Sequence, residues 1–166
     1  MAKLGVITDG ISRDLRHALG VMREVGLTHA ELQFIGEKEV GDLSAQEMKA
    51  AKGLIDDHGL AVSCISRHNF GGIAVRATEA GDATHTKHMD GLKRCIEMAH
   101  EFGTKLVRIM SFSKEMILFG SHGADHWMVS QGAWDQLLKL LAPPVRLAED
   151  EGVTLVLETG NNAMVT

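Results

Sequence analysis

The residues best suited to do chemistry stand at or near the ends of short apolar runs. Glu158 follows the run Thr154–Leu157, and His68 comes three residues after the run Ala61–Ile65. A carboxylate and an imidazole can each transfer a proton or bind a metal ion, provided that the fold brings a partner close. Less specialised roles stay open for both. Glu158 also suits an ion pair with Arg108 or a loop cap, and His68 a hydrogen bond to the backbone.

The elements that must position these residues repeat along the chain. Five short runs rich in Val, Ile and Leu predict strands: Leu4–Ile7, Ala30–Ile35, Ala61–Ile65, Lys105–Met110 and Thr154–Leu157. Apolar residues at helical spacing fill the segments between them: Leu15, Leu19, Met22 and Val25; Met48, Ala51 and Ile55; Leu92, Ile96 and Ala99; Trp134, Leu137, Leu138 and Leu141. The chain therefore alternates strand and helix.

Capping signals support the four helices. Ser12 suits the N-cap of the first helix, and Ser44-Ala45-Gln46-Glu47 is typical of a capping box. A glycine stands before each later strand, which predicts the helix ends: Gly26, Gly59, Gly103 and Gly152. Pro143 and Pro144 predict a kink or a split in the fourth helix.

Repeated strand–helix units require parallel strands, in an open doubly wound sheet or in a (β/α)8 barrel. Strands of an open sheet are apolar on both faces, whereas Glu31 and Arg108 place charges within two of these strands. We therefore favour an α/β fold of the TIM-barrel type, with about the first five strands and four helices present, as one domain over residues 1–166. A flavodoxin-like binding module is the alternative.

Three stretches resemble the sugar phosphate isomerase/epimerase family, whose members are xylose isomerase-like TIM barrels. Gly26-Leu27-Thr28-His29-Ala30-Glu31-Leu32 is similar to the family's second strand, and Ala61–His68 to a strand that ends in histidine. The segment from Leu147 through Gly152-Val153 to Glu158 is similar to its fifth strand. The resemblance covers essentially the whole chain as the first five strand–helix units of the barrel.

The resemblance implies a divalent-metal-dependent isomerase or epimerase of a small sugar, sugar phosphate or polyol-derived ketone, working through an enediolate. It makes Glu158 a ligand of a Mn, Mg, Zn or Co ion and a catalytic acid–base group. Most other ligands are expected from later strands, beyond residue 166. His68 and Asn161 are expected to contact the substrate. The ketohexose 3-epimerases have a further acidic residue soon after this glutamate, where this chain has Gly160-Asn161-Asn162-Ala163-Met164.

The composition of the chain limits the kinds of molecule that it is expected to bind and the compartment in which it is expected to occur. The formal net charge is −5 and no basic run occurs, so we expect no nucleic-acid partner. No apolar run approaches the roughly 20 residues of a membrane span. A strand so close to Met1 leaves no room for a signal peptide, and Cys64 and Cys95 lack metal or redox spacing, so we expect a reduced, cytoplasmic protein.

Five strands do not close an eight-stranded barrel, so a homo-oligomer, or a non-catalytic partial barrel stabilised by self-association, is a second hypothesis.

The other polar residues are expected to have structural roles, except in two loops where a position near the substrate stays open. Glu31 and Arg108 are expected to form a buried ion pair. His122 and His126 are expected in a solvated or substrate-facing loop, and His85 and His88 in solvent before the third helix. The segment from Asn69 to Ile73 is either a lid over substrate or a surface loop.

Overall fold

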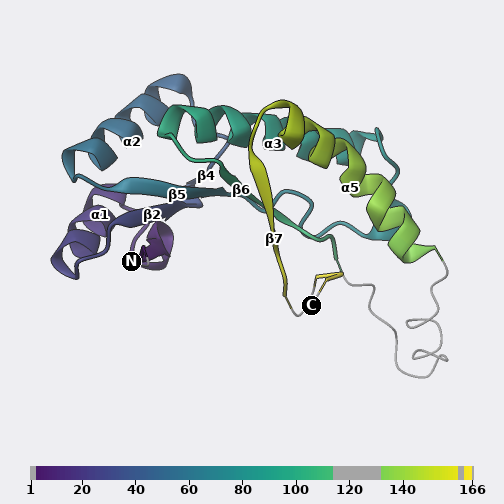
Figure 1. Cartoon of the computed structure of the whole chain (residues 1–166), viewed down its shortest axis with the longest axis horizontal. Coiled ribbons are helices and arrows are strands. Elements are labelled where there is room, and N and C mark those ends of the chain that lie inside the picture. Colours follow the sequence, from purple (N-terminus) through teal and green to yellow (C-terminus); the bar gives the residue numbers. More distant parts are fainter. Residues whose placement is uncertain (1–2, 114–131, 161–162, 166) are drawn as a thin grey trace.

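A computed structural model describes residues 3–113, 132–160 and 163–165. Five strands form one parallel sheet in the order β1-β2-β5-β6-β7 (Figure 1). They are β1 (Gly5–Ile7), β2 (His29–Leu32), β5 (Ala61–Ser66), β6 (Leu106–Met110) and β7 (Thr154–Glu158). The strands thus follow chain order across the sheet. A flavodoxin-like sheet has the order 2-1-3-4-5, so that alternative is wrong and the partial barrel is confirmed.

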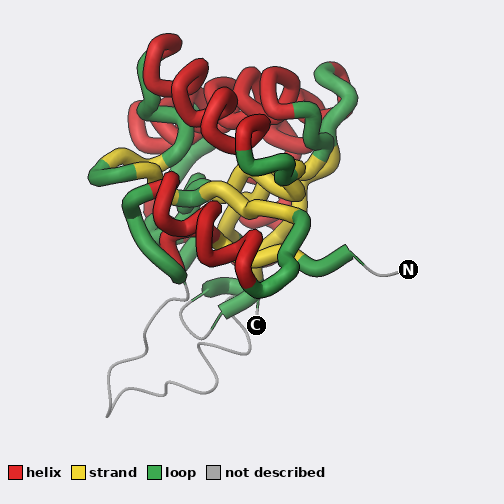
Figure 2. Tube along the Cα trace, turned by 90° about the vertical axis from the view of Figure 1, so that its left-hand side faces the viewer, coloured by secondary structure: helices red, strands yellow, loops and turns green. Residues whose placement is uncertain are grey.

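Helices lie between consecutive strands. They are α1 (Leu15–Glu24), α2 (Ala45–Asp57), α3 (Ala83–Phe102) and α5 (Ala133–Asp150), with short 3-10 turns η1 (Thr8–Gly10) and η2 (Val75–Ala77). In Figure 1, α2, α3 and α5 lie above the strands, and Figure 2 shows the helical layer over the sheet from the side. Since α1 contacts α2, and α3 contacts α5, neighbouring helices also touch one another. Within the described residues, no helix is long and apolar enough to cross a membrane.

The sequence signals for helix starts are partly confirmed. The Ser44 hydroxyl accepts the Glu47 N–H at 3.3 Å, and the Glu47 carboxylate accepts the Ser44 N–H at 2.8 Å, which completes the capping box. The prediction of Ser12 as N-cap of α1 is wrong by two residues. Asp14 is the N-cap and accepts the His17 N–H at 3.3 Å, while the Ser12 hydroxyl accepts the Asp14 N–H at 3.1 Å.

The predicted helix ends are confirmed by backbone conformation. Gly103, which caps α3, has φ 71° and ψ 25°, a left-handed conformation that costs a residue with a Cβ free energy. The same positive φ occurs at each of the other three predicted glycines: Gly26, Gly59 and Gly152.

The core fills the space between sheet and helices. Val107 and Ile109 alternate with Arg108 along β6, and Leu19 and Leu92 meet the sheet from α1 and α3 as fully buried side chains. The stripe predicted on the last helix is only partly right. Leu137 and Leu140 are buried in α5, but Trp134 and Leu138 are 58% and 64% exposed, because they lie on the helix side away from the sheet.

The predicted strand Ala30–Ile35 is interrupted. β2 ends at Leu32, and Gln33 separates it from β3 (Phe34–Ile35), which pairs antiparallel with β4 (Lys38–Glu39). The chain thus makes a small hairpin immediately after its second barrel strand. This hairpin brings Glu39 back toward the end of β5, where its carboxylate reaches Arg67.

Helix α5 passes through Pro143 and Pro144 as one continuous helix, so of the predicted kink or split, the split is wrong. Pro144 has no N–H and therefore leaves the carbonyl of Leu140, four residues earlier, without its helical donor. The Nε2 of His85 on α3 lies 3.0 Å from that carbonyl oxygen and supplies the missing hydrogen bond. His85 is 2% exposed, so its predicted solvation is wrong.

The segment after β5 is anchored to the core. Asn69 is 1% exposed and Phe70 is fully buried, stacked on His88 with ring centroids 5.6 Å apart. The Nδ1 of His88 accepts the Phe70 N–H at 2.9 Å, so the prediction that His88 is solvated is also wrong. Burial, and then the charge of Lys87, lowers the pKa of His88 below its ordinary value of 6.5.

Candidate functional site

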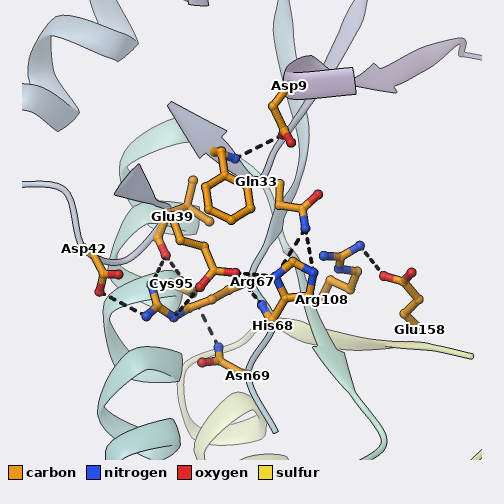
Figure 3. A network of polar contacts seen from close by, with 12 residues as sticks. Asp9, Gln33, Glu39, Asp42, Arg67, His68, Asn69, Cys95, Arg108 and Glu158 are labelled. Atoms are coloured by element: carbon orange, nitrogen blue, oxygen red, sulfur yellow. Dashed lines mark hydrogen bonds and ion pairs between the residues drawn. The ribbon is translucent and has the colours of Figure 1, made fainter. Parts of the chain in front are cut away.

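The carboxyl ends of the parallel strands meet at one edge of the sheet, where barrel enzymes place their active sites. The register sets Ser66, Arg108 and Val156 side by side on β5, β6 and β7, and pairs Met110 with Glu158. Because side chains alternate between faces, Arg108 and Glu158 lie on the same face of the sheet, opposite the helix-facing Val107 and its neighbours. Figure 3 shows the polar side chains gathered at this edge.

Arg108 and Glu158 form an ion pair across two neighbouring strands. Nη1 of Arg108 contacts Oε2 of Glu158, and the two side chains are 9% and 42% exposed. The arginine is therefore nearly buried. The glutamate side chain is partly exposed, although its Oε2 atom, which contacts Arg108, is buried. Among the residues that the structure describes, none forms a hydrogen bond with the buried Nε and Nη2 atoms of Arg108. They form the edge of the guanidinium that binds carboxylates and phosphates with two parallel hydrogen bonds.

The predicted ion pair between Glu31 and Arg108 is wrong. Glu31 lies beside Cys64 on β5, whereas Arg108 lies on β6, two strands away, and adjoins β7. Glu31 instead accepts the hydroxyl hydrogen of Ser66 at 2.5 Å. The carboxylate that reaches Arg108 is Glu158, as the alternative interpretation of that residue has it.

His68 is held at the end of β5 by Glu39 of the hairpin. One carboxylate oxygen of Glu39 lies 2.6 Å from Nδ1 of His68 and accepts the His68 backbone N–H at 2.9 Å. The Nε2 atom of Gln33 lies 2.9 Å from Nε2 of the same ring. His68 is 49% exposed and Glu39 17% exposed, so the carboxylate is shielded and the imidazole is open to solvent.

Arg67 holds Glu39 and the residues that follow it in place. Its Nε lies 3.6 Å from the second oxygen of Glu39, and its Nη2 lies 3.1 Å from Asp42. Nη1 donates to the carbonyl of Val40 at 2.5 Å. The guanidinium therefore connects Glu39 of the hairpin, and Val40 and Asp42 directly after it, to the end of β5 (Figure 3).

The hairpin also contacts the segment between β1 and α1. The Phe34 N–H donates to Asp9, which follows β1, at 3.1 Å. The guanidinium of Arg13 lies 4.6 Å from the Phe34 ring centroid and pairs with Glu37 at 3.1 Å. Consecutive barrel strands are thus linked at their carboxyl ends by polar side chains.

Sequence reasoning found Glu158 and His68 but missed the residues that hold His68: Gln33, Glu39, Asp42 and Arg67. A polar residue directly after a strand was the available signal for Gln33 and Arg67. Nothing in the local pattern marked Glu39, because its role depends on the hairpin. Asn161, expected to contact the substrate, and His122 and His126 lie outside the described residues.

The fit to a metal ion is partial. Carboxylate oxygen is a ligand that hard divalent cations prefer, so Glu158 has suitable chemistry. Among the residues that the structure describes, no group of three His, Cys, Asp or Glu side chains could hold a metal ion. Further metal ligands would have to come from residues that the structure does not describe.

A hollow of about 520 Å³ lies on the same face of the sheet, toward the amino ends of the strands. It is lined by Lys3, Gly5, His29 and Lys105 among others, and Glu158 does not line it.

The chain matches the model of a known protein family. Residues 19–165 match the family model described as xylose isomerase-like TIM barrel. No curated protein sequence matches the chain.

Solved structures share the fold. An L-ribulose 3-epimerase is 20% identical, with a TM-score of 0.66 over 98% of this chain and 51% of its own. A 3-keto-D-glucoside 4-epimerase from E. coli is 21% identical, with a TM-score of 0.57 over 90% of this chain and 52% of its own. A xylose isomerase-like TIM barrel protein from Mycobacterium smegmatis, in complex with magnesium, is 18% identical, with a TM-score of 0.60 over 89% and 47%. The chain spans about half the length of these structures.

Proposed function

Because the chain belongs to the xylose isomerase-like TIM-barrel family, we propose that it acts as a divalent-metal-dependent isomerase or epimerase of a small sugar, sugar phosphate or polyol-derived ketone. The names of two matched structures, an L-ribulose 3-epimerase and a 3-keto-D-glucoside 4-epimerase, support a carbohydrate substrate. The magnesium in a third supports a divalent ion.

The observation that carries the proposal is the place of Glu158. It ends β7 at the edge where barrel enzymes place their chemistry, and Arg108 contacts its carboxylate from the neighbouring strand. We propose that Glu158 supplies one oxygen ligand to a Mn, Mg, Zn or Co ion, with the other ligands from residues that the structure does not describe. When bound, such an ion would polarise the substrate carbonyl and stabilise negative charge on its oxygen.

We propose that the reaction transfers a proton at the carbon next to the substrate carbonyl. A base removes the proton from the carbon next to the carbonyl, and the electron pair moves onto the carbonyl oxygen. In an epimerisation the carbonyl re-forms and a proton returns to the opposite face of the same carbon. In an isomerisation a proton adds to the former carbonyl carbon, the hydroxyl of the neighbouring carbon gives up its proton and becomes the new carbonyl, and the former carbonyl oxygen takes up a proton. We propose that Glu158 takes part in this transfer, and that His68 and Asn161 bind substrate hydroxyls. Through its contact with Oε2, Arg108 would hold the Glu158 carboxylate in one orientation at the carboxyl ends of the strands.

Solvent deuterium tests this reaction class directly. The purified protein is incubated in D2O with MnCl2 or MgCl2 and with L-ribulose, D-fructose or D-xylulose, and proton spectra are recorded over time. We expect loss of the proton signal at the carbon next to the carbonyl for at least one ketose, and its suppression by EDTA. Unchanged spectra for all three ketoses with either metal would contradict the proposal.

One observation favours the second hypothesis, a partial barrel that self-associates. In the described residues, β1 and β7 are the outer strands of the sheet, and each pairs with a neighbour on one side only. Open strand edges expose backbone groups that can pair with another chain. Sedimentation velocity tests this idea, since it predicts a species heavier than the 18.0 kDa of one chain that dissociates on dilution. A concentration-independent monomer would rule it out.

A further inference from the structure

We propose that Glu39 is a positioning residue that fixes one tautomer of His68 and thereby leaves Nε2 of that ring as the hydrogen-bond acceptor for a substrate hydroxyl. The proposal goes beyond the ligands and acid–base groups of the site, and its substrate part rests on the proposed function. It concerns how this chain prepares its own binding residue.

The contact between Glu39 and His68 has a defined hydrogen-bond direction. An ionised carboxylate has no hydrogen to donate, so the ring must donate through Nδ1 over the 2.6 Å that separate the two atoms. The same carboxylate oxygen accepts the backbone N–H of His68 at 2.9 Å. Two donors of one residue thus share one acceptor, which fixes both the ring and the backbone at the end of β5.

The other ring nitrogen of His68, Nε2, has the opposite hydrogen-bonding role. A neutral imidazole carries one N–H, so a hydrogen on Nδ1 leaves Nε2 as an acceptor. Gln33 Nε2 lies 2.9 Å from Nε2 and 3.4 Å from Nδ1. An atom in line with the Nε2 lone pair would lie much farther from Nδ1 than from Nε2. The amide of Gln33 therefore lies over the face of the His68 ring. The lone pair of Nε2, which lies in the plane of the ring, is not used by Gln33 and can accept a hydrogen bond from a ligand.

Glu39 is itself held in place by Arg67. Its side chain is 17% exposed, and its second oxygen lies 3.6 Å from Nε of Arg67. Arg67 is itself fixed by Asp42 at 3.1 Å and by the Val40 carbonyl at 2.5 Å. A shielded carboxylate with a braced partner holds an imidazole more firmly than an exposed one would. The ring that it holds is 49% exposed at the edge of the sheet that carries Glu158.

These features suit a polyhydroxylated ligand. A hydroxyl both donates and accepts, so it can donate to Nε2 of His68 and accept from the amide of Gln33, which lies against the same ring. With the hydrogen on Nε2 instead, the ring would offer a second donor and lose this match. Glu39 therefore selects the form of His68 that accepts from hydroxyls.

The test measures the tautomer by NMR of 15N-histidine-labelled protein, with His68 assigned from a His68→Gln variant. We expect the wild-type ring to carry its hydrogen on Nδ1. Glu39→Gln keeps the shape but can donate as well as accept, so we expect the population with hydrogen on Nε2 to rise. Glu37→Gln is the matched control on the same hairpin, where the carboxylate contacts Arg13 and not His68, and we expect the wild-type spectrum. Hydrogen on Nε2 in the wild type, or no change in Glu39→Gln, would overturn the proposal.

L-Ribulose is the probe for the substrate part. We expect it to shift the Nε2 resonance of the wild type saturably, and its Kd to rise about 3- to 10-fold in Glu39→Gln, the loss of one neutral hydrogen bond. An unchanged Kd, or no effect of L-ribulose on Nε2, would overturn the assignment of Nε2 as the hydroxyl acceptor. Neither measurement requires turnover. If deuterium exchange fails while these results hold, the proposed reaction fails and the role of Glu39 stands.

Discussion

The guanidinium of Arg108 on β6 contacts the carboxylate of Glu158 on the neighbouring strand β7. The two exposures differ, since the arginine side chain is 9% exposed and the glutamate side chain is 42% exposed. Glu158 is thus the counter-ion of a nearly buried charge and also a carboxylate that a ligand can reach. Substitutions of Arg108 and of Glu158 therefore test the same ion pair from its two sides.

The asymmetry predicts unequal costs of removing either partner. Glu158→Gln leaves the buried guanidinium without a counter-ion and should lower the free energy of unfolding by about 3 kcal/mol. Arg108→Met leaves a carboxylate that water can solvate and should cost about 1 kcal/mol or less. The double variant should cost less than Glu158→Gln alone. Urea unfolding followed by circular dichroism measures all three.

A surface pair provides the control for this cycle. Glu151 and His100 lie 3.5 Å apart with both side chains about half exposed, so Glu151→Gln should cost under about 0.5 kcal/mol. Equal losses from the two single variants would contradict the predicted asymmetry, and strictly additive losses in the double variant would mean that Arg108 and Glu158 are not coupled.

The hydrogen bond from His85 to the Leu140 carbonyl predicts a coupling with Pro144. His85→Leu removes the donor and leaves a buried carbonyl unpaired, which should cost about 1 to 3 kcal/mol. Pro144→Ala restores a helical N–H for that carbonyl, so the same His85→Leu change should cost less in the Pro144→Ala background. Thermal unfolding of the four proteins tests the cycle. A cost that is the same in both backgrounds would show that the carbonyl does not depend on His85.

Acid should destabilise the segment at Phe70 through His88. Burial lowers the pKa of His88 in the folded protein below 6.5, so the unfolded chain takes up this proton first as the pH falls. The stabilisation is fully present above pH 6.5 and decreases below it, and protonation of Nδ1 would also remove the acceptor of the Phe70 N–H. Unfolding free energies at pH 7.5 and 5.5 should therefore differ less in His88→Gln than in the wild type. An identical pH dependence in both proteins would exclude His88 as its source.

Both cysteines should resist modification in the folded protein. Burial raises the pKa of Cys95 to about 12 and also raises the pKa of Cys64 above its ordinary value. Thiolate is the reactive form, so Cys95 should hold roughly a thousandfold less of it than a thiol with the ordinary pKa of 9.0. Ellman's reagent at pH 8 should titrate two thiols in urea and almost none in native buffer. Rapid reaction of either cysteine in the native protein would contradict this account of its surroundings.

The barrel strands and their order could be predicted because each strand carries several Val, Ile or Leu residues and each following helix has its own apolar stripe. The capping box at Ser44 and the glycine at Gly103 are local signals, and both were confirmed. The hairpin of β3 and β4 was missed because two-residue strands are too short for any alternation of polar and apolar side chains to be seen.

Partners far apart in the sequence were harder to predict. Arg108 was expected to pair with Glu31, but the register between β5, β6 and β7 decides which carboxylate it reaches. His85 was expected in solvent because its partner is a carbonyl freed by a proline on another helix. The roles assigned to Glu158 and His68 as site residues stay predictions, as does the expected cytoplasmic location.

The most direct test of the central claim is the rate of solvent deuterium incorporation into L-ribulose by the wild type and by Glu158→Gln in the presence of Mn2+. Glu149→Gln, an exposed change on α5, serves as the control. The account predicts incorporation by the wild type and by Glu149→Gln, and a loss of at least about 100-fold in Glu158→Gln with the circular dichroism spectrum retained. Incorporation by Glu158→Gln at the wild-type rate would remove this carboxylate from the mechanism.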